Sequence, residues 1–244
     1  MARIQGMKGP KGSLEERLRK RRYAFLARVC EKFGATKLAL GHTRDDQAET
    51  VLMRILRGSG LAGMSAILPK RTLGAVEIVR PLIDVSRAEI LFFLKAKRAV
   101  FRTDASNADM RFTRNRIRRR LLPLIEKEFN PNIKEGLAQM ADLVVSDYQC
   151  LESLARDFIG AHVKRTARGL VVSLDRLKKL DIALRRLVFR GMLKAAQGDL
   201  KRIGYRHWAE MEDLLWSRRA GSRVHLPRRV AVLKTKNRLN ISCF

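Results

Sequence analysis

Three side chains within residues 41–50 have the types and the spacing that chemistry needs. His42, Asp46 and Glu49 are spaced i, i+4 and i+7, so a helix that contains all three presents them on one face. An imidazole and two carboxylates on one face can hold a metal ion or a nucleotide. This run is therefore the first candidate site in the sequence.

The elements that flank this run place it at the end of a strand. Residues 36–40 and 76–82 are predicted to form strands, and residues 51–58 continue as an amphipathic helix. In open α/β sheets, ligands bind beyond the carboxyl ends of the strands. The same pattern has a structural interpretation, because Thr43 or Asp45 can cap the helix and acidic residues in a first turn stabilise its dipole.

The charge of the chain is strongly unbalanced. Its 244 residues include 52 Lys and Arg against 24 Asp and Glu, a formal net charge of +28. Such an excess favours a polyanionic partner through phosphate neutralisation and counterion release. Nucleic acid is the first candidate. An anionic membrane surface is the second and weaker one, because the basic residues are spread over several segments and not gathered on one amphipathic helix.

Composition and cysteine spacing point to a cytoplasmic protein without a membrane partner. No apolar run approaches the roughly 20 residues that span a bilayer, and the N-terminus lacks the apolar region of a signal peptide. Cys30, Cys150 and Cys243 form no C-x-x-C pair. They are predicted to be reduced thiols and not metal ligands.

Two further helices are predicted from capping boxes, in which Glu follows a serine cap by three residues. Ser13 opens a helix over residues 13–33 that Gly34 terminates, and Ser86 opens one that ends near residue 98. The apolar positions expected to be buried are Leu18, Tyr23, Phe25, Leu26 and Val29 in the first helix and Ile90, Leu91, Phe93 and Leu94 in the second.

Residues 110–120 contain six arginines, which cannot all point one way on a helix. Some must reach a ligand or a carboxylate, and others must face water. The planar fork of arginine matches phosphate oxygens, so this segment is the best candidate for contact with a nucleotide or an RNA backbone. The alternative is a solvated basic helix face.

A second domain is predicted to begin at residue 129, so that the domains are residues 1–128 and 129–244. Asn130 and Pro131 are expected to start a long helix. The elements expected in this domain are that helix to residue 163, a strand at 169–174, helices near 181–197 and 205–217, and extended segments at 223–232 and 237–242.

The C-terminal tail is basic. No acidic residue follows Asp213, and the tail includes the adjacent Arg228 and Arg229, so it is predicted to face a polyanion. Trp208 and Trp216 could stack on bases, but at a spacing of eight on one helix they are predicted to be core residues.

Four blocks of the sequence resemble one family in the order that the family has them. The run GHTRDDQAETVLMRILRGSGLAGM resembles the second signature of the N-type ATP pyrophosphatases, in the form found in the tRNA(Ile)-lysidine synthetases. The other blocks are SLEERLRKRRYAFL, EIVRPLIDVSRAEI and DASNADMRFTRNRIRRRLLPLI. Together the four blocks span residues 13–125.

The resemblance implies an α/β fold. This fold is an incomplete doubly wound parallel sheet, Rossmann-like and of the PP-loop ATPase type, followed by a mostly helical, basic tRNA-binding domain. It also implies a two-step ligation that uses ATP and Mg²⁺. ATP adenylates the C2 carbonyl oxygen of the wobble cytidine of tRNA(Ile) with a CAU anticodon, and pyrophosphate leaves. The ε-amine of free L-lysine then attacks C2, AMP leaves, and lysidine is formed.

The resemblance assigns roles to residues at matching positions. Asp46 and Glu49 become the candidates for binding Mg²⁺ or for receiving the lysine ammonium, and Asp46 is the residue assigned to the metal. The catalytic set is Asp46, Glu49, His42, Arg22 and Arg114, with Asn115 and Arg118 in support. The nucleotide-binding set is Gly41, His42, Arg22 and Arg114. The tRNA-binding set is Arg111, Arg116, Arg118, Arg119, Arg120, Arg228 and Arg229. Asp104 and Asn107 are expected to order their loop.

One departure from the family pattern concerns the nucleotide site. The Ser-Gly-Gly-x-Asp-Ser loop that cradles the pyrophosphate in the family has no counterpart here. We therefore expect a fragment, a truncated product, or a chain that works with a separate N-terminal segment or as a homodimer. An open sheet edge then predicts poor solubility. Two other functions remain open: a tRNA-thiolation enzyme, although the cysteine pairs usual there are missing, and a non-catalytic tRNA-binding remnant.

Overall fold

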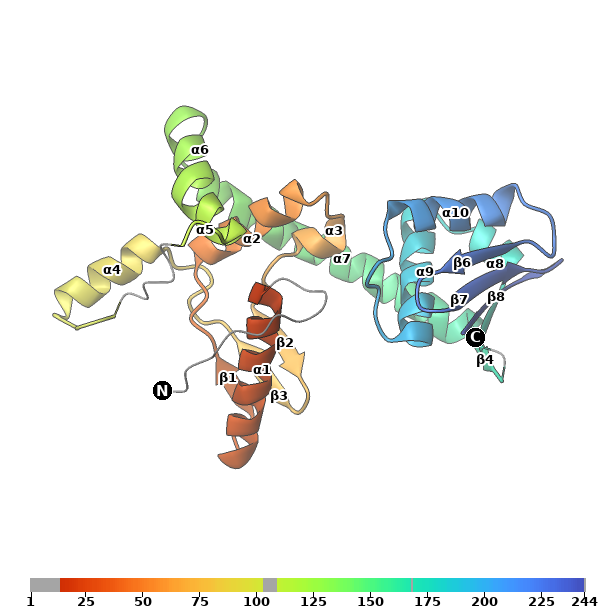
Figure 1. Ribbon diagram of the computed structural model, residues 1–244, viewed down its shortest axis with the longest axis horizontal. Coiled ribbons are helices and arrows are strands. Elements are labelled where there is room, and N and C mark those ends of the chain that lie inside the picture. The colour runs from red at the N-terminus through yellow and green to blue at the C-terminus, as the bar shows by residue number, and fades with distance from the viewer. Residues whose placement is uncertain (1–13, 103–108, 168, 244) are drawn as a thin grey trace. The chain divides into compact units, whose positions relative to one another are not determined.

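The computed structural model describes residues 14–102, 109–167 and 169–243 (Figure 1). The expected cap at Ser13 and the expected loop residues Asp104 and Asn107 lie outside the described residues. Within these described ranges, no helix is both long enough and apolar enough to cross a membrane.

The chain divides into two compact units. Unit 1 comprises residues 1–145 and unit 2 comprises residues 146–244. The long helix α7 (Ile133–His162) runs through this division. The predicted boundary at residue 129 falls just before that helix and stays a prediction.

The sheet of unit 1 has three strands in the order β1-β3-β2. Their bounds are Lys37–Ala39 (β1), Lys70–Leu73 (β2) and Val76–Val79 (β3). β1 and β3 are parallel, with Leu38 opposite Ile78, which confirms the predicted strands and the α/β class. β2 was not predicted; it pairs antiparallel with β3 across a turn in which Gly74 has a φ of +60°. The carboxyl ends of β1 and β3 therefore lie at one edge of the sheet.

The helices of unit 1 include the two that capping residues predicted. These two predicted helices are α1 (Leu14–Lys32) and α4 (Arg87–Ala96). The other described helices of unit 1 are α2 (Arg44–Leu56), α3 (Leu61–Met64), α5 (Thr113–Arg116), the π-helix η2 (Ile117–Leu121), α6 (Leu122–Glu128) and the first part of α7. α2 begins at Arg44 because the hydroxyl of Thr43 accepts a hydrogen bond from Asp46 N at 3.3 Å. His42 therefore precedes α2, so this helix does not contain all three candidate residues.

The buried core of unit 1 lies between α2 and the segment from η2 to α7. It consists of Ala48, Val51, Ile117, Leu122, Leu137 and Ala141. Because α2 packs its apolar side here, its polar first turns are held at the edge of the sheet where β1 and β3 end.

Two helices that were predicted to bury an apolar side leave much of it in solvent. On α1, Phe25 is 57% exposed and Leu18 is 36% exposed. On α4, Phe93 is 59% exposed and Leu91 is 40% exposed, and this helix runs away from the sheet (Figure 1). The predicted burial of these four residues is wrong, because a three-stranded sheet is too narrow to cover both helices. The other predicted positions, Tyr23, Leu26, Val29, Ile90 and Leu94, are partly buried.

Unit 2 is built on an antiparallel sheet in the order β4-β5-β8-β7-β6. Its strands are β4 (Lys164–Thr166), β5 (Gly169–Ser173), β6 (Arg223–Leu226), β7 (Val230–Lys234) and β8 (Arg238–Cys243). Its helices are the rest of α7, α8 (Leu174–Lys178), α9 (Ile182–Gln197) and α10 (Tyr205–Trp216). The predicted long helix, the strand at 169–174, the helices near 181–197 and 205–217 and the segment at 237–242 are confirmed. The single extended segment predicted at 223–232 is instead two strands joined by a turn, and β4 and α8 were not predicted. Phe189, Met192, Leu214 and Ile241 are fully buried in the core of the unit.

The two tryptophans of α10 have different surroundings. Trp208 packs against the core of unit 2, as predicted. Trp216 is 53% exposed, so the prediction that it is a core residue is wrong. Lys178 Nζ lies 5.2 Å and the guanidinium carbon of Arg185 lies 5.5 Å from the centroid of the Trp216 ring. In a core position apolar side chains would contact the faces of the Trp216 ring, whereas here two cations contact them.

Candidate functional site

A cluster of two carboxylates and two guanidinium groups lies beyond the carboxyl end of β1. Glu49, in the second turn of α2, is 1% exposed. Its Oε2 accepts hydrogen bonds from Arg114 Nε at 2.7 Å and Arg118 Nη2 at 2.9 Å, and its Oε1 accepts one from Arg118 Nε. A carboxylate buried this deeply is tolerated only with charged, hydrogen-bonding partners, which the two arginines supply.

Asp46, one turn earlier on α2, belongs to the same cluster. Its Oδ1 accepts hydrogen bonds from Arg114 Nη2 at 2.9 Å and Arg118 Nη2 at 3.1 Å. Its Oδ2 accepts from the backbone N of Thr43 at 3.0 Å and from the Thr43 hydroxyl at 3.1 Å. Two carboxylates therefore face two guanidinium groups, and their charges balance. Burial acts to lower the pKa of Arg118, but the hydrogen bond and charge of Glu49 outweigh it and raise that pKa.

The arginine-rich segment supplies this cluster with two of its six arginines. Arg114 in α5 and Arg118 in η2 are four residues apart, and both turn toward the carboxylates. The four exposed arginines are Arg111, Arg116, Arg119 and Arg120. As predicted, some arginines of the segment reach carboxylates and others face water; the exposed Arg111 does both, because it pairs with Asp109. Arg118, which was assigned to tRNA binding, lies in the first group.

Asn115 is buried beside this cluster and holds the start of the arginine-rich segment in place. It is 8% exposed, and its side-chain amide donates to Asp109 O at 2.8 Å. Asp109 in turn pairs with the exposed Arg111 at 2.8 Å. These contacts give Asn115 a structural role, and the supporting role in catalysis that was predicted for it stays a prediction.

His42 follows β1 and lies next to a buried arginine. Arg80, which directly follows β3, is 5% exposed, and its Nε donates to His42 Nδ1 at 3.2 Å. Burial and then the charge of Arg80 lower the pKa of His42 to about 4, while the charge of Asp46 acts in the opposite direction. His42 is therefore neutral at neutral pH. Arg80 was not among the predicted site residues, although an Arg-Pro-Leu motif at a strand end indicates one.

Two predicted site residues lie apart from the cluster. Arg22 is exposed on α1, with its guanidinium carbon 5.9 Å from the centroid of the Tyr23 ring, and among the described residues no hydrogen bond joins it to the cluster. Arg19, one turn earlier, is near enough to help lower the pKa of His42. Gly41 is exposed, and a Cβ built on it would meet no atom within 4 Å. The roles predicted for Arg22 and Gly41 stay predictions.

The donor set of the cluster does not fit a metal ion as it stands. In the described part of the chain, no three His, Cys, Asp or Glu side chains are grouped to hold one. Each oxygen of Asp46 already accepts two hydrogen bonds. Mg²⁺ needs carboxylate oxygens at close range in near-octahedral geometry. Binding of Mg²⁺ by Asp46 therefore requires a guanidinium group to move away.

Asp45 ties the first turn of α2 to its neighbours. Its Oδ2 accepts from Arg87 N at 2.7 Å, at the start of α4, and its Oδ1 lies 3.6 Å from Lys134 Nζ of α7. Lys134 also pairs with Glu126 at 2.9 Å. Burial acts to lower the pKa of Lys134, but the two carboxylates outweigh it and raise that pKa. Asp45 thus has a structural role, and no sequence signal pointed to Lys134.

The predicted tRNA-binding residues of unit 2 occupy the turn between β6 and β7. Arg228 and Arg229 are exposed, and their φ angles are +66° and +59°. Left-handed backbone costs a non-glycine residue about 1–2 kcal/mol, so this turn is strained. Asp199 pairs with Arg228 at 3.0 Å, whereas Arg229 has no ion pair within the described residues. The turn therefore presents Arg229 to solvent.

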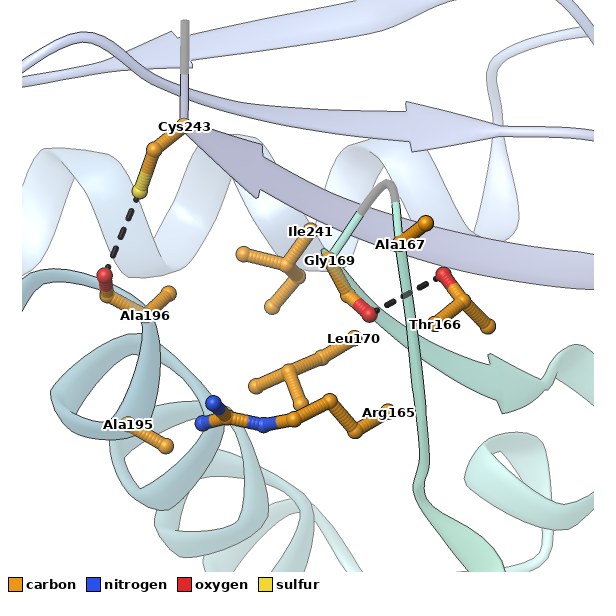
Figure 2. A pocket seen from close by; sticks show the side chains of 9 residues that line it. All are labelled: Arg165, Thr166, Ala167, Gly169, Leu170, Ala195, Ala196, Ile241 and Cys243. Atoms are coloured by element: carbon orange, nitrogen blue, oxygen red, sulfur yellow. Dashed lines mark hydrogen bonds between the residues drawn. The ribbon is translucent and has the colours of Figure 1, made fainter.

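Two cavities in unit 2 contain none of the predicted catalytic residues. One, of about 300 Å³, lies between the β4–β5 hairpin, β8 and the end of α9 (Figure 2). Leu170 and Ile241 line it together with Arg165, and the Cys243 thiol donates to Ala196 O at 3.2 Å. The other, of about 400 Å³, lies between α7 and α9.

Family models match both halves of the chain. A PP-loop domain model matches residues 2–125, and a TilS substrate binding domain model matches residues 173–239. The first match covers the four sequence blocks and confirms the resemblance that they carry. The second covers most of unit 2, including the turn at Arg228 and Arg229.

Several curated relatives are named tRNA(Ile)-lysidine synthase. The relative from Geobacter sulfurreducens is 39% identical over 92% of this chain and 47% of its own length. Those from Symbiobacterium thermophilum and Solibacter usitatus are 46% and 37% identical, over 60% and 90% of this chain and 30% and 49% of their own lengths. The chain thus spans about half of these relatives or less.

One solved structure is also similar. The tRNA thiolase NcsA from Methanococcus maripaludis is 19% identical with a TM-score of 0.46, over 56% of this chain and 45% of that chain. A likeness this weak carries no argument about function.

Proposed function

This chain belongs to the PP-loop domain family, and from that premise we propose that it is part of a tRNA(Ile)-lysidine synthase. In the proposed reaction, ATP adenylates the wobble cytidine of tRNA(Ile) with a CAU anticodon, and free L-lysine then displaces AMP. The observation that carries the proposal is the cluster of Asp46, Glu49, Arg114 and Arg118 at the carboxyl end of β1. In addition, this chain is 39% identical, over 92% of its own length, to a relative that is named tRNA(Ile)-lysidine synthase.

The geometry of the cluster suggests which guanidinium group leaves Glu49 when a lysine ammonium binds there. Arg118 binds Glu49 through two nitrogens, whereas Arg114 binds it through one. We therefore expect Arg114 to be the guanidinium that leaves when a lysine ammonium takes its place. Once released, Arg114 can contact a phosphate group, which matches its planar fork. The ε-amine must lose a proton before it attacks C2, and we expect a carboxylate of the cluster to accept that proton.

The nucleotide is expected beside His42 and Gly41. Gly41 leaves open space at the end of β1, where ligands approach parallel sheets. Arg22 and Arg114 are the predicted phosphate contacts. Mg²⁺ is expected to accompany ATP, whose phosphates supply much of its oxygen coordination in such sites. Asp46 is the side chain of this cluster that was predicted to hold the ion.

The tRNA is expected to bind through exposed arginines in both units. In unit 1 these are Arg111, Arg116, Arg119 and Arg120, and in unit 2 they are Arg228 and Arg229. The net charge of +28 supports binding through phosphates. Arg118 is better placed to support Glu49 than to contact RNA. A tRNA substrate agrees with the expected cytoplasmic location.

We test the proposal by incorporation of labelled lysine into a tRNA(Ile) CAU transcript with ATP and Mg²⁺. The mixtures are this chain alone, this chain with a supplied N-terminal segment that carries the Ser-Gly-Gly-x-Asp-Ser loop, and the segment alone. Incorporation that needs both pieces supports the proposal. Incorporation by the chain alone would support the function and remove the need for the loop. tRNA binding without incorporation in any mixture would favour the non-catalytic remnant.

A further inference from the structure

Arg80 is a buried cation with neutral partners. It is 5% exposed, and its backbone N donates to Pro69 O at 3.0 Å. Its guanidinium donates to Leu68 O through Nη1 and to His42 Nδ1 through Nε at 3.2 Å. Within the described residues, no carboxylate pairs with it. Burying a guanidinium without a counterion is unfavourable, so its burial beside His42 points to a role in the site.

The hydrogen bond from Arg80 determines the form of the His42 ring. An arginine side chain has five N–H donors and no acceptor, and it keeps its proton in proteins. The Nδ1 atom that faces Arg80 must therefore present a lone pair. In a neutral imidazole the proton then resides on Nε2, because the bond made by one ring nitrogen sets the state of the other. Among the described residues, Nε2 donates to no acceptor, and the ring is half-buried.

We propose that Arg80 is a positioning residue that fixes His42 as the neutral Nε2–H tautomer, ready to donate a hydrogen bond to a phosphate oxygen. The choice of a phosphate ligand rests on the proposed function, whereas the tautomer rests on the contact between Arg80 and His42 alone. A neutral donor at this position can bind an anion without releasing or taking up a proton.

The charges that face His42 also suit an anionic ligand. Arg80, Arg114 and Arg19 act on the ring as cations, and Asp46 acts on it as an anion. Three cations against one carboxylate leave the surroundings of the ring positive. Burial of the ring is the largest cause of the shift in the pKa of His42, and together with these cations it lowers that pKa to about 4.

The test is a long-range ¹H–¹⁵N spectrum of the full chain labelled at its histidines. The chain has four histidines, and the signals of His42 are identified by their loss in His42→Gln. We expect an unprotonated Nδ1 and a protonated Nε2, unchanged from pH 8 to pH 5. A proton on Nδ1, or titration of His42 near pH 6.5, would overturn the proposal. The other three histidines, His162, His207 and His225, all lie in unit 2, so His42 is the one histidine of unit 1.

Variants of two arginines separate the proposed role from a general effect of charge. Arg80→Met keeps the length of the side chain and removes the donor to Nδ1, so the two tautomers should mix and the pKa of His42 should rise. Arg44→Met is the matched control. Arg44 also donates to a backbone carbonyl, Asp84 O at 2.7 Å, and it does not contact His42. His42 signals that respond equally to both substitutions would overturn the proposal.

Inorganic pyrophosphate probes the ligand class. Added to the wild-type chain, it should shift Nε2 of His42 more than Nδ1. Absence of any shift, with the expected tautomer present, would overturn phosphate as the ligand and leave the role of Arg80 intact. None of these spectra depends on lysine incorporation. A chain with the expected tautomer that fails to make lysidine would therefore contradict the proposed function and not this inference.

Discussion

Replacing Glu49 by glutamine removes the negative charge at the centre of the cluster and keeps the shape of the side chain. The amide oxygen can still accept one guanidinium hydrogen bond, but its NH₂ group faces the second guanidinium as donor against donor. Arg114 and Arg118 then share the single remaining carboxylate of Asp46. We expect Glu49→Gln to destabilise unit 1, because two partly buried cations lose a partner.

The size of this effect follows from burial. Removing one partner of a buried ion pair costs about 3–5 kcal/mol. Here Glu49 is 1% exposed, while the side chains of Arg114 and Arg118 are 25% and 24% exposed, so solvent screens part of the loss. We therefore expect a loss of about 2–3 kcal/mol. With a urea dependence of about 2 kcal/mol per M, the unfolding midpoint of unit 1 falls by about 1 M.

The positions of the tryptophans allow the two units to be followed separately. Trp208 and Trp216, the two tryptophans of the chain, both lie in unit 2. Their fluorescence therefore reports the unfolding of unit 2, whereas hydrogen exchange of α2 and η2 reports that of unit 1. Glu49→Gln should raise the exchange rates in unit 1 and leave the fluorescence transition in place.

The matched control is the buried ion pair of unit 2. Arg185 is 5% exposed and binds Glu212 through Nε at 3.0 Å and Nη2 at 2.8 Å. Glu212→Gln should shift the fluorescence transition and spare α2. If Glu49→Gln left hydrogen exchange in unit 1 unchanged, or destabilised unit 1 and unit 2 equally, the cluster would not be a local source of stability for unit 1.

The remaining expectations concern RNA binding, pH and self-association. Replacing Arg228 and Arg229 by glutamine should weaken tRNA binding and reduce the slope of log K for tRNA binding against log salt concentration by about 1–2. An unchanged slope in a filter-binding titration would remove this turn from the interface. The pKa of His42 is about 4 in the folded chain against 6.5 unfolded, so the unfolded state binds more protons between these values. Unit 1 should therefore lose stability as the pH falls from 6.5 to 4, and His42→Gln should lessen that loss in urea titrations; an unaltered pH profile would contradict the shift. Because Phe33 is 76% and Phe92 is 77% exposed and β1 is an edge strand, the chain alone should self-associate in sedimentation experiments, and a monodisperse monomer would refute this.

Local sequence signals predicted the frame of the site well. The strand before Gly41 and the helix after it are present, and Thr43 was one of two caps considered for α2. Ser86 caps α4 as expected, with its hydroxyl accepting from Glu89 N at 3.2 Å. The two helix caps depend on side chains that hydrogen-bond to backbone groups three residues away, so a short stretch of sequence contains both partners.

Local sequence signals could not predict features that depend on residues distant in the sequence. The sequence indicated that some arginines reach carboxylates, but the choice of Arg114 and Arg118 depends on where α5 and η2 pack against α2. The role of Arg80 appears only when β3 lies beside β1. The exposed side of α1 was predicted to be buried, because an apolar stripe shows that a helix can pack but not how much sheet is present to cover it.

The most direct test of the central claim compares two substitutions at the start of α2 in the reconstituted lysine-incorporation assay. Asp46→Asn removes the carboxylate, and Thr43→Ala removes the hydroxyl that caps the helix, at a cost of about 1 kcal/mol. We expect Asp46→Asn to reduce lysine incorporation by at least about 100-fold with tRNA affinity nearly unchanged, while Thr43→Ala stays active. Equal activity of the two variants, or parallel loss of incorporation and tRNA binding in Asp46→Asn, would show that Asp46 supports the fold and not the reaction.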